Sequence, residues 1–465
     1  MPAGVVFAPE LIRRYGGPAP RYTSYPTALQ FTPQFGEPDL RRVIAERDDA
    51  APAAPLSVYL HVPFCSSPCY YCGCTRVITR QPEVIEAYVR RLIVEIGLQA
   101  QLFGRRREIV QLHFGGGTPT TLDAGQFGRI MGALDRHFGL SNSPRREYSI
   151  EIDPRTLDDE TMPMLAALGF NRVSFGVQDF DPAVQEAIHR VQPAWQTWRA
   201  IDQARSAGFA SVSLDLIYGL PRQTPASFAR TLDQVAEAGP DRIAVYAYAH
   251  MPQLFRAQRR IALADLPTPE TRLELLQLSI DRLTGAGYVY IGMDHFARPD
   301  DELAKALADG TLQRNFQGYS TQGGCDLLAL GMSAISHIGG CYSQNSKDMK
   351  AYAQAIDAGH LPVVRGLRLT DEDELRRGVI EDLMCRGAVD IAAVERTHHI
   401  DFETHFAEEL RDLDRLAQDG LVARDARHIR VSPAGRLLIR RVAQTFDAYT
   451  RPTGPAPDRP ASNAV

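Results

Sequence analysis

The sequence predicts an α/β fold, built as a partial (β/α)6 barrel. Between residues 55 and 298, short β-branched or aromatic runs alternate with turns rich in Gly, Pro or Asp and with amphipathic segments of helical period. This alternation is typical of parallel strands joined by right-handed helical crossovers. Six such repeats favour a curved or partly closed barrel over a doubly wound sheet, although the pattern by itself leaves both open.

The elements of the barrel follow one another in a regular order. Each strand is a short apolar run, and each helix fills the interval between two runs. One helix opens after Thr224-Pro225 and closes at Gly239-Pro240, which are ordinary start and stop signals. The predicted strands are 57–63, 110–114, 148–152, 172–177, 211–217 and 242–248, and the predicted helices include 82–102, 123–138, 195–207 and 226–238.

Less regular segments flank the barrel, which occupies 55–298. Residues 1–54 are rich in Pro and predict an arm that covers the active site, and 299–369 is a loop-rich segment expected to complete a substrate cavity. Residues 370–448 predict a small, mostly helical domain similar to a winged helix, in which a β-wing precedes a helix. Residues 449–465 are expected to form a disordered tail.

The composition argues against several classes of function. The 51 Lys and Arg against 56 Asp and Glu give a net charge of −5, which offers no electrostatic footprint for wrapping duplex nucleic acid. Lys occurs only at positions 305, 347 and 350, so no phosphate-binding loop with its Lys is present. No apolar run is long enough to span a membrane, and the N-terminus lacks the basic start of a signal peptide. We therefore expect a cytoplasmic protein with neither nucleic-acid binding nor membrane insertion.

Four of the seven cysteines lie within ten residues, at positions 65, 69, 72 and 74. This clustering argues against a disulfide framework and for a metal or redox centre. Thiolates of Cys65, Cys69 and Cys72, after the first strand, can hold three corners of a cubane iron–sulfur cluster and leave one iron open. Zinc is the alternative, but no second pair of Cys or His ligands follows. Cys74 is either a fourth ligand or a free thiol, and the alternating direction of side chains in an extended segment favours the second.

This cysteine loop, together with Gly115-Gly116-Gly117-Thr118-Pro119 after the second strand, resembles the radical S-adenosylmethionine (SAM) superfamily. The resemblance implies the TIM-like barrel of radical SAM enzymes and a 4Fe-4S cluster with three Cys ligands. Other segments extend over nearly the whole chain and resemble the oxygen-independent coproporphyrinogen III oxidase family: RYTSYPT, CYYCGC, QLHFGGGTPT, SIEIDPR, GVQDF, LDLIYGLPRQT, GMDHFARPDDEL, NFQGYSTQG and GRLLIR.

The resemblance implies an oxidoreductase of haem biosynthesis. Its substrate would be coproporphyrinogen III, whose two reacting propionates become the vinyl groups of protoporphyrinogen IX. No side-chain base with a pKa near neutrality removes a proton from so unactivated a carbon, whereas a radical can remove the hydrogen atom. The family generates that 5′-deoxyadenosyl radical from SAM under anaerobic conditions. The implied partners are a low-potential electron donor such as flavodoxin or ferredoxin and an electron acceptor, and we expect a monomer.

The family also implies two bound SAM molecules and a set of contact residues. The glycine motif would contact the methionine part of SAM through Gly116, Gly117 and Thr118. Glu151 would accept hydrogen bonds from ribose hydroxyls, although an acid at a strand end is more often a solvated edge residue. The resemblance also implies catalytic roles for Cys74 and Tyr22. The remaining cofactor-binding residues implied by the resemblance are Tyr59, Tyr71, Gly73, Gln178, Arg190, Asp215, Ala249 and Ile335.

A substrate with four propionates on a large apolar ring needs several Arg beside aromatic side chains. Arg is so abundant in this chain that the sequence does not identify the ones that bind. The segments RYTSYPT and NFQGYST supply candidate covers, which are equally compatible with an ordinary role in anchoring loops: Arg21, Tyr22, Tyr25, Asn315, Gln317 and Tyr319.

Two other functions fit the cysteine loop. Relatives that share this loop bind and deliver haem without catalysis, but they typically lack the extra Cys, the RYTSYPT arm and the MDHFARP segment, all of which this chain has. A redox sensor holding iron–sulfur or zinc would leave the polar residues at the strand ends without a use. The sequence therefore favours the enzyme.

Overall fold

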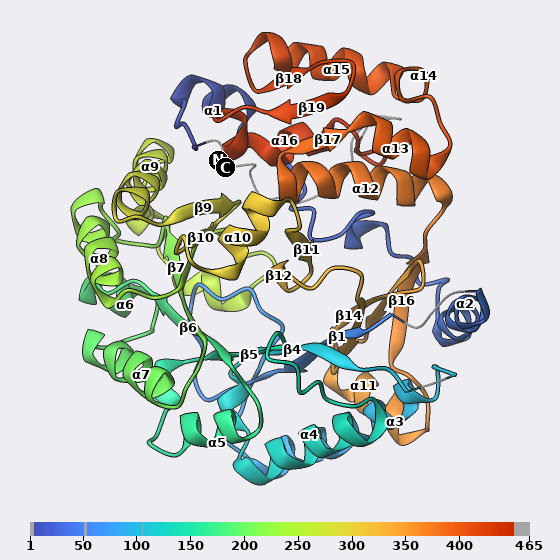
Figure 1. The fold of residues 1–465 in the computed structure, drawn as a ribbon. Coiled ribbons are helices and arrows are strands. Elements are labelled where there is room, and N and C mark those ends of the chain that lie inside the picture. Colours follow the sequence, from blue (N-terminus) through green and yellow to red (C-terminus); the bar gives the residue numbers. More distant parts are fainter. Residues whose placement is uncertain (1–3, 51–53, 105, 451–465) are drawn as a thin grey trace. The chain divides into compact units, whose positions relative to one another are not determined.

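A computed structural model describes residues 4–50, 54–104 and 106–450 of the chain (Figure 1). It contains two compact units, each assembled from stretches that are far apart in the sequence. Unit 1 consists of Met1–Gln30, Leu283–Gly323 and Leu369–Val465, and unit 2 consists of Phe31–Arg282 and Gly324–Arg368.

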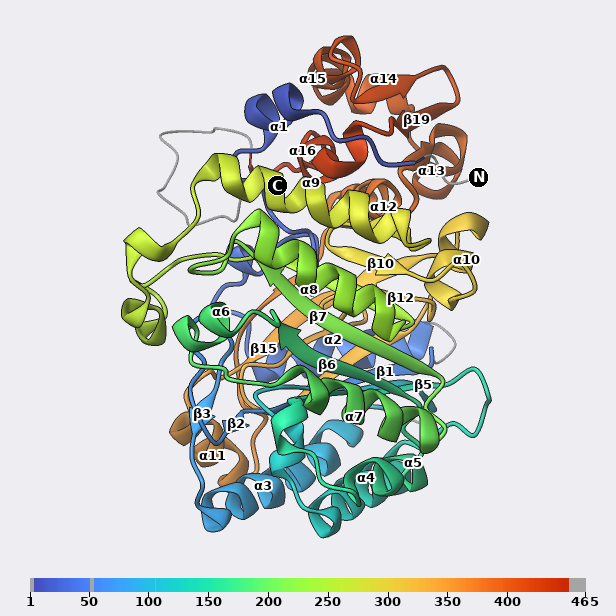
Figure 2. The same ribbon diagram turned by 90° about the vertical axis from the view of Figure 1, so that its left-hand side faces the viewer.

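Unit 2 contains the predicted series of parallel strands, which pair in the order of the sequence. Each strand starts and ends within two residues of its predicted bounds, because the apolar runs that define the strands are local features. The strands curve as a partial barrel (Figures 1 and 2). They are β1 (Leu56–Val62), β4 (Ile109–Gly116), β5 (Glu147–Ile152), β6 (Arg172–Gln178), β7 (Ser211–Tyr218) and β8 (Arg242–Ala247).

Helices connect these strands and lie along the outside of the curved sheet (Figure 2). Helix α8 (Pro225–Ala238) begins with a capping box between Thr224 and Ser227 and ends at Gly239, which has the left-handed conformation. The other helices that connect barrel strands are α3 (Pro82–Ala100), α4 (Ala124–His137), α5 (Thr161–Ala167), α6 (Pro182–Ala187) and α7 (Ala194–Ser206).

The sheet of unit 2 continues beyond β1 with four strands from the segment that the sequence indicated as loop-rich. β13 (Asp326–Leu330) pairs in parallel with β1, and the next three strands are antiparallel: β14 (Ile335–Ile338), β15 (Cys341–Asn345) and β16 (Val363–Arg368). All five residues of β15 are buried. Two further helices of this unit are α2 (Glu37–Ala50) and α11 (Met349–Asp357).

Unit 1 is mostly helical, and it has its own hydrophobic core, which includes Tyr22, Tyr25, Phe402 and Phe446. The predicted β-wing is present as β18 (Val422–Arg424) and β19 (His428–Val431), joined by β17 (Ala388–Asp390). The other elements include α1 (Pro9–Tyr15), β9 (Val289–Gly292), β10 (His295–Ala297), α10 (Glu302–Asp309), β11 (Gln313–Asn315), β12 (Gly318–Ser320), α12 (Asp371–Arg386), α13 (Ile391–His398), α14 (Phe402–His405), α15 (Ala407–Gln418) and α16 (Ile439–Gln444). Helix α9 (Pro269–Gly285) contains the boundary between the units.

The predicted tail begins with Tyr449, whose hydroxyl donates a hydrogen bond to Asp373 at 2.8 Å. The rest of this prediction, from residue 451 onward, lies outside the described residues. Within the described ranges, no helix has both the length and the apolar character that crossing a bilayer requires.

Candidate functional site

A cavity of about 260 Å³ lies at the carboxyl ends of the barrel strands in unit 2. This end of a β/α barrel is the usual position of an active site, because the loops from successive strands meet there. Residues from the cysteine loop, the glycine motif and the ends of β5, β6 and β7 line the cavity. The predicted residues among them are Cys65, Cys69, Tyr71, Cys72, Cys74, Gly116, Gly117, Thr118, Glu151, Gln178, Arg190 and Asp215.

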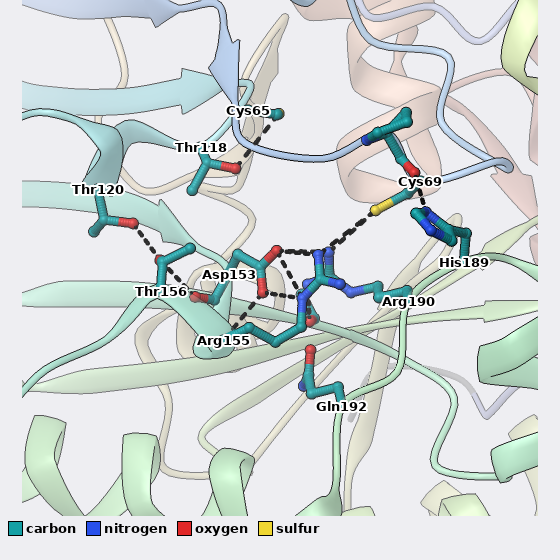
Figure 3. Close-up of polar contacts among 12 residues, drawn as sticks. Cys65, Cys69, Thr118, Thr120, Asp153, Arg155, Thr156, His189, Arg190 and Gln192 are labelled. Atoms are coloured by element: carbon teal, nitrogen blue, oxygen red, sulfur yellow. Dashed lines mark hydrogen bonds and ion pairs between the residues drawn. The ribbon is translucent and has the colours of Figure 1, made fainter. Parts of the chain in front are cut away.

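Each of the three predicted ligand cysteines accepts a hydrogen bond at its sulfur. Cys65 accepts from the Thr118 hydroxyl at 3.5 Å, and Cys72 accepts from the backbone N–H of Cys74 at 3.4 Å. Cys69 accepts from the Arg190 guanidinium at 3.6 Å (Figure 3). A hydrogen bond to sulfur favours the thiolate that ligates metal. At Cys65 burial nevertheless raises the pKa, and the hydrogen bond from Thr118 opposes this shift.

Cys74 is exposed at the end of the loop, and its thiol is hydrogen-bonded to the sulfur of Cys72. This hydrogen bond lowers the pKa of Cys72 to about 6, although burial opposes the shift. The two side chains therefore meet, in contrast to the opposite directions that an extended C-x-C segment would give them. The backbone is not an extended strand here but bends at Cys74, so the alternation of side-chain directions along a strand does not apply.

The donor set fits an iron–sulfur cluster. In a cubane, each Cys binds a different iron, so the three sulfurs do not need to converge on one point. The described part of the chain has no group of three His, Cys, Asp or Glu placed to hold one metal ion.

The glycine motif leads from the end of β4 into a short 3-10 helix at Pro119–Thr121, and the backbone N–H groups of Gly117 and Thr118 donate hydrogen bonds to Val62 and Phe64. Gly116 has φ of +111°, and a Cβ there would lie 2.5 Å from the His61 ring. A Cβ on Gly117 would lie 2.6 Å from the carbonyl oxygen of Phe64. Both positions therefore require glycine, because a side chain would strain the backbone or collide with the first strand.

Glu151, at the end of β5, uses both of its carboxylate oxygens. Oε1 is 3.2 Å from Nε2 of His113, and Oε2 accepts a hydrogen bond from the backbone N–H of Gly116 at 3.0 Å. Burial alone would raise the pKa of Glu151, but these contacts lower it below its usual value. His113 was not predicted from the sequence, since one His in an apolar strand gives no signal of its partner.

A group of charged side chains surrounds Cys69 (Figure 3). Arg190 is 6% exposed, and its Nη1 lies 3.0 Å from Oδ2 of Asp153, which also binds Arg155 at 2.6 Å. Nε of Arg190 is buried and has no hydrogen-bond partner among the described residues. The sequence pointed to Arg190 but not to Asp153 or Arg155, although both lie in the SIEIDPR segment.

Asp215 and Gln178 also line the cavity. Burial raises the pKa of Asp215 to about 7, the charge of Glu151 adds to this shift, and a hydrogen bond of 2.9 Å from Ser174 opposes it. Gln178 has φ of +68° at the irregular end of β6. Backbone strain of this kind is common at functional sites.

Other predicted residues lie outside this cavity lining. The Tyr59 hydroxyl is 3.0 Å from Nδ1 of His61, and its ring stacks on His113. Tyr22 belongs to unit 1, where its buried hydroxyl donates to Asp447 at 2.9 Å. Three more predicted residues also lie outside the cavity lining: Gly73 beside the Phe255 ring, Ala249 at an exposed position after β8, and Ile335 at the start of β14.

Comparison with known proteins agrees with this geometry. Residues 59–235 match the Radical SAM superfamily, and residues 369–438 match the HemN C-terminal domain. The chain is 50% identical over 440 residues to the oxygen-independent coproporphyrinogen III oxidase of Pseudomonas aeruginosa, with 95% of each chain covered. It is 48% identical over 441 residues to that of Escherichia coli, again with 95% of each covered.

A solved structure described as coproporphyrinogen III oxidase (HemN) from Escherichia coli, a radical SAM enzyme, has the same fold. It superposes with a TM-score of 0.90 at 47% identity and covers 96% of this chain and 99% of its own. This chain is therefore a radical SAM enzyme that belongs to the family of oxygen-independent coproporphyrinogen III oxidases.

Proposed function

We propose that this enzyme catalyses the anaerobic oxidative decarboxylation of two propionates of coproporphyrinogen III, giving the two vinyl groups of protoporphyrinogen IX. The observation that carries the proposal is the shared cavity: three hydrogen-bonded cysteines line it together with Glu151 and Asp215. Relatives named for this activity match 95% of the chain.

Cys65, Cys69 and Cys72 would hold a 4Fe-4S cluster, which when bound supplies the electron that cleaves SAM into methionine and a 5′-deoxyadenosyl radical. The chain itself binds and orients the reactants. The backbone at Gly116 and Gly117 packs closely against His61 and Phe64 and lines the cavity, where it is proposed to contact the methionine part of SAM.

Charged groups in the same cavity suit the binding of a second SAM molecule. SAM carries a carboxylate, an ammonium and a sulfonium, so it needs both an anion site and cation sites. Arg190 offers its unpartnered Nε to a carboxylate, and Asp215 offers a carboxylate to cationic or hydroxyl groups. The other proposed contacts of this second SAM are Tyr59, Tyr71, Gln178, Ala249 and Ile335. Glu151 is proposed to bind the ribose of the first SAM, and Gly73 is a further proposed cofactor contact.

Cys74 and Tyr22 are proposed to act in catalysis beyond holding cofactors. The thiol of Cys74 is hydrogen-bonded to Cys72 and exposed, so it is available to exchange a proton near the reacting groups. We further propose that a flavodoxin or ferredoxin supplies the electron, that a separate acceptor removes the electron left by decarboxylation, and that the enzyme acts as a monomer.

The test is anaerobic incubation of the reconstituted enzyme with coproporphyrinogen III, SAM, a reductant and an electron acceptor. We expect protoporphyrinogen IX and 5′-deoxyadenosine, and about four irons and four sulfides per chain. Serine at position 65, 69 or 72 should abolish both products. The matched control is Cys325→Ser, which lies outside the cysteine loop and should retain both products. Stoichiometric haem binding without any product would instead favour a haem carrier.

A further inference from the structure

Unit 1 contains four arginines whose charges act on one another or on the same tyrosine hydroxyl, here called the arginine cluster: Arg21, Arg314, Arg436 and Arg440. They come from the N-terminal arm, from β11 and from the C-terminal segment around α16. The pKa of Arg440 is lowered to about 10 by burial and by the charges of Arg21 and Arg314. The charges of Arg314 and Arg436 both act on the hydroxyl of Tyr319.

Two members of the arginine cluster are fixed by backbone carbonyls. Arg440 is 4% exposed and donates hydrogen bonds to the carbonyl oxygens of Ala19 and, at 2.9 Å, of Pro20. Arg436 donates to the carbonyl oxygens of Tyr290 at 3.0 Å and of Ile291 at 3.1 Å. These bonds hold the positive charges in place before any ligand arrives.

Arg314 differs from the other three arginines because two of its guanidinium nitrogens are buried but make no hydrogen bond to the described residues. Its guanidinium lies over the ring of Tyr319, 4.8 Å from the centroid. Nε and Nη1 are buried and have no hydrogen-bond partner among the described residues. Leaving charged donors desolvated and unpaired costs free energy, so their retention points to a ligand that accepts hydrogen bonds from them.

One acid lies against the arginine cluster. Asp294 pairs with Arg21 at 2.5 Å, and its charge also acts on Arg440. Three other acids contact residues outside the cluster: Glu381 lies 3.6 Å from Arg377, Asp382 lies 2.6 Å from Arg386, and Asp447 accepts a hydrogen bond from the hydroxyl of Tyr22. Guanidinium groups gathered in this way suit an anionic ligand.

We propose that the arginine cluster binds a carboxylate of the substrate, with Arg314 as the residue that contacts it. This inference rests on the proposed function, because coproporphyrinogen III carries four propionates. Nε and Nη1 of Arg314 offer hydrogen bonds to carboxylate oxygens, and the ring of Tyr319 lies beside this guanidinium.

The experiment measures binding of coproporphyrin III, which has the same four propionates, and of its tetramethyl ester to the anaerobic holoenzyme. Arg314→Gln should weaken binding of the tetra-acid about 10- to 100-fold and leave binding of the ester unchanged. The affinity of Arg314→Lys for the tetra-acid should lie between those of the wild type and Arg314→Gln, since Lys keeps the positive charge but lacks the planar guanidinium. The matched control is Arg396→Gln, an exposed position of α13 in the same unit, which should bind both ligands as the wild type does.

Thermal unfolding without ligand separates this role from a structural one. Arg314→Gln should keep or raise the unfolding temperature, because it removes buried donors that lack partners. Tetra-acid binding equal to that of the wild type, or equal loss of both ligands with a lower unfolding temperature, would overturn the site. The binding assay needs no turnover, so it tests the carboxylate site independently of the reaction. If the enzyme forms no product but still binds the tetra-acid more tightly than the ester, and Arg314→Gln removes this preference, the proposed reaction is refuted and the carboxylate site is supported.

Discussion

Arg190 and Asp153 form a buried ion pair beside the cysteine loop, with Nη1 of the guanidinium 3.0 Å from Oδ2 of the carboxylate. Their side chains are only 7% and 10% exposed. The same nitrogen lies 3.6 Å from the sulfur of Cys69, so one guanidinium connects the acid to a predicted cluster ligand (Figure 3). Asp153 thus fixes the guanidinium that donates a hydrogen bond to the sulfur of Cys69.

Asp153→Asn should destabilise the protein by about 3 kcal/mol, because it leaves Arg190 buried without its counter-ion. Urea unfolding measures this cost, and SAM affinity should fall as well because the guanidinium is no longer held. Asp159→Asn removes an acid from a solvent-exposed pair with Arg199 and should leave the midpoint unchanged. Equal effects of the two substitutions would contradict the role given to Asp153.

Gly116→Ala should lose cleavage of SAM and destabilise the fold by about 2–3 kcal/mol. The new Cβ would lie 2.5 Å from the His61 ring, on a backbone with φ of +111°. Gly128→Ala in α4 is the control: the space around that position is open, and alanine should stabilise the helix by about 0.5–1 kcal/mol. Production of 5′-deoxyadenosine and thermal unfolding are the measurements.

Asp215→Asn should stabilise the ligand-free protein in a pH-dependent way. The folded pKa of Asp215 is raised to about 7, above its unfolded value, so the folded state holds the proton more tightly. Wild-type stability therefore falls as pH rises from about 4 to 7, and the gain from Asn grows over the same interval to about 1–3 kcal/mol. Urea titrations at pH 5, 6, 7 and 8 measure this difference, and a flat difference would disprove the assignment.

Glu95→Ala should cost about 3–5 kcal/mol, since Glu95 is fully buried on α3 and accepts three hydrogen bonds. The donors are the backbone N–H of Gly331 at 2.8 Å, the amide of Asn345 at 2.7 Å and the hydroxyl of Tyr352 at 2.7 Å. Tyr352→Phe removes one donor and should cost about 1 kcal/mol. Calorimetry on both variants tests this ranking, which an equal loss would refute.

The strands β13 to β16 show where prediction from the sequence stops. The barrel strands can be predicted because each is an apolar run in the local sequence. The sequence of β15, in contrast, is Cys-Tyr-Ser-Gln-Asn and has no apolar pattern. Its polar side chains are buried because partners far along the chain satisfy them. Asn345, for example, donates to Glu95, which is 250 positions away. A strand stabilised by such contacts gives no signal in its own sequence.

The candidate site likewise contains residues that the sequence predicted and residues that only the tertiary structure revealed. Spacing and local motifs identified Cys65, Cys69 and Cys72 and the glycine turn, because their chemistry depends on neighbours along the chain. Only the tertiary structure joined Asp153 to Arg190, His113 to Glu151 and the members of the arginine cluster to one another, since electrostatic partners are selected by distance in space. Periodicity and spacing are properties of a chain, whereas burial and charge balance arise only when distant segments pack.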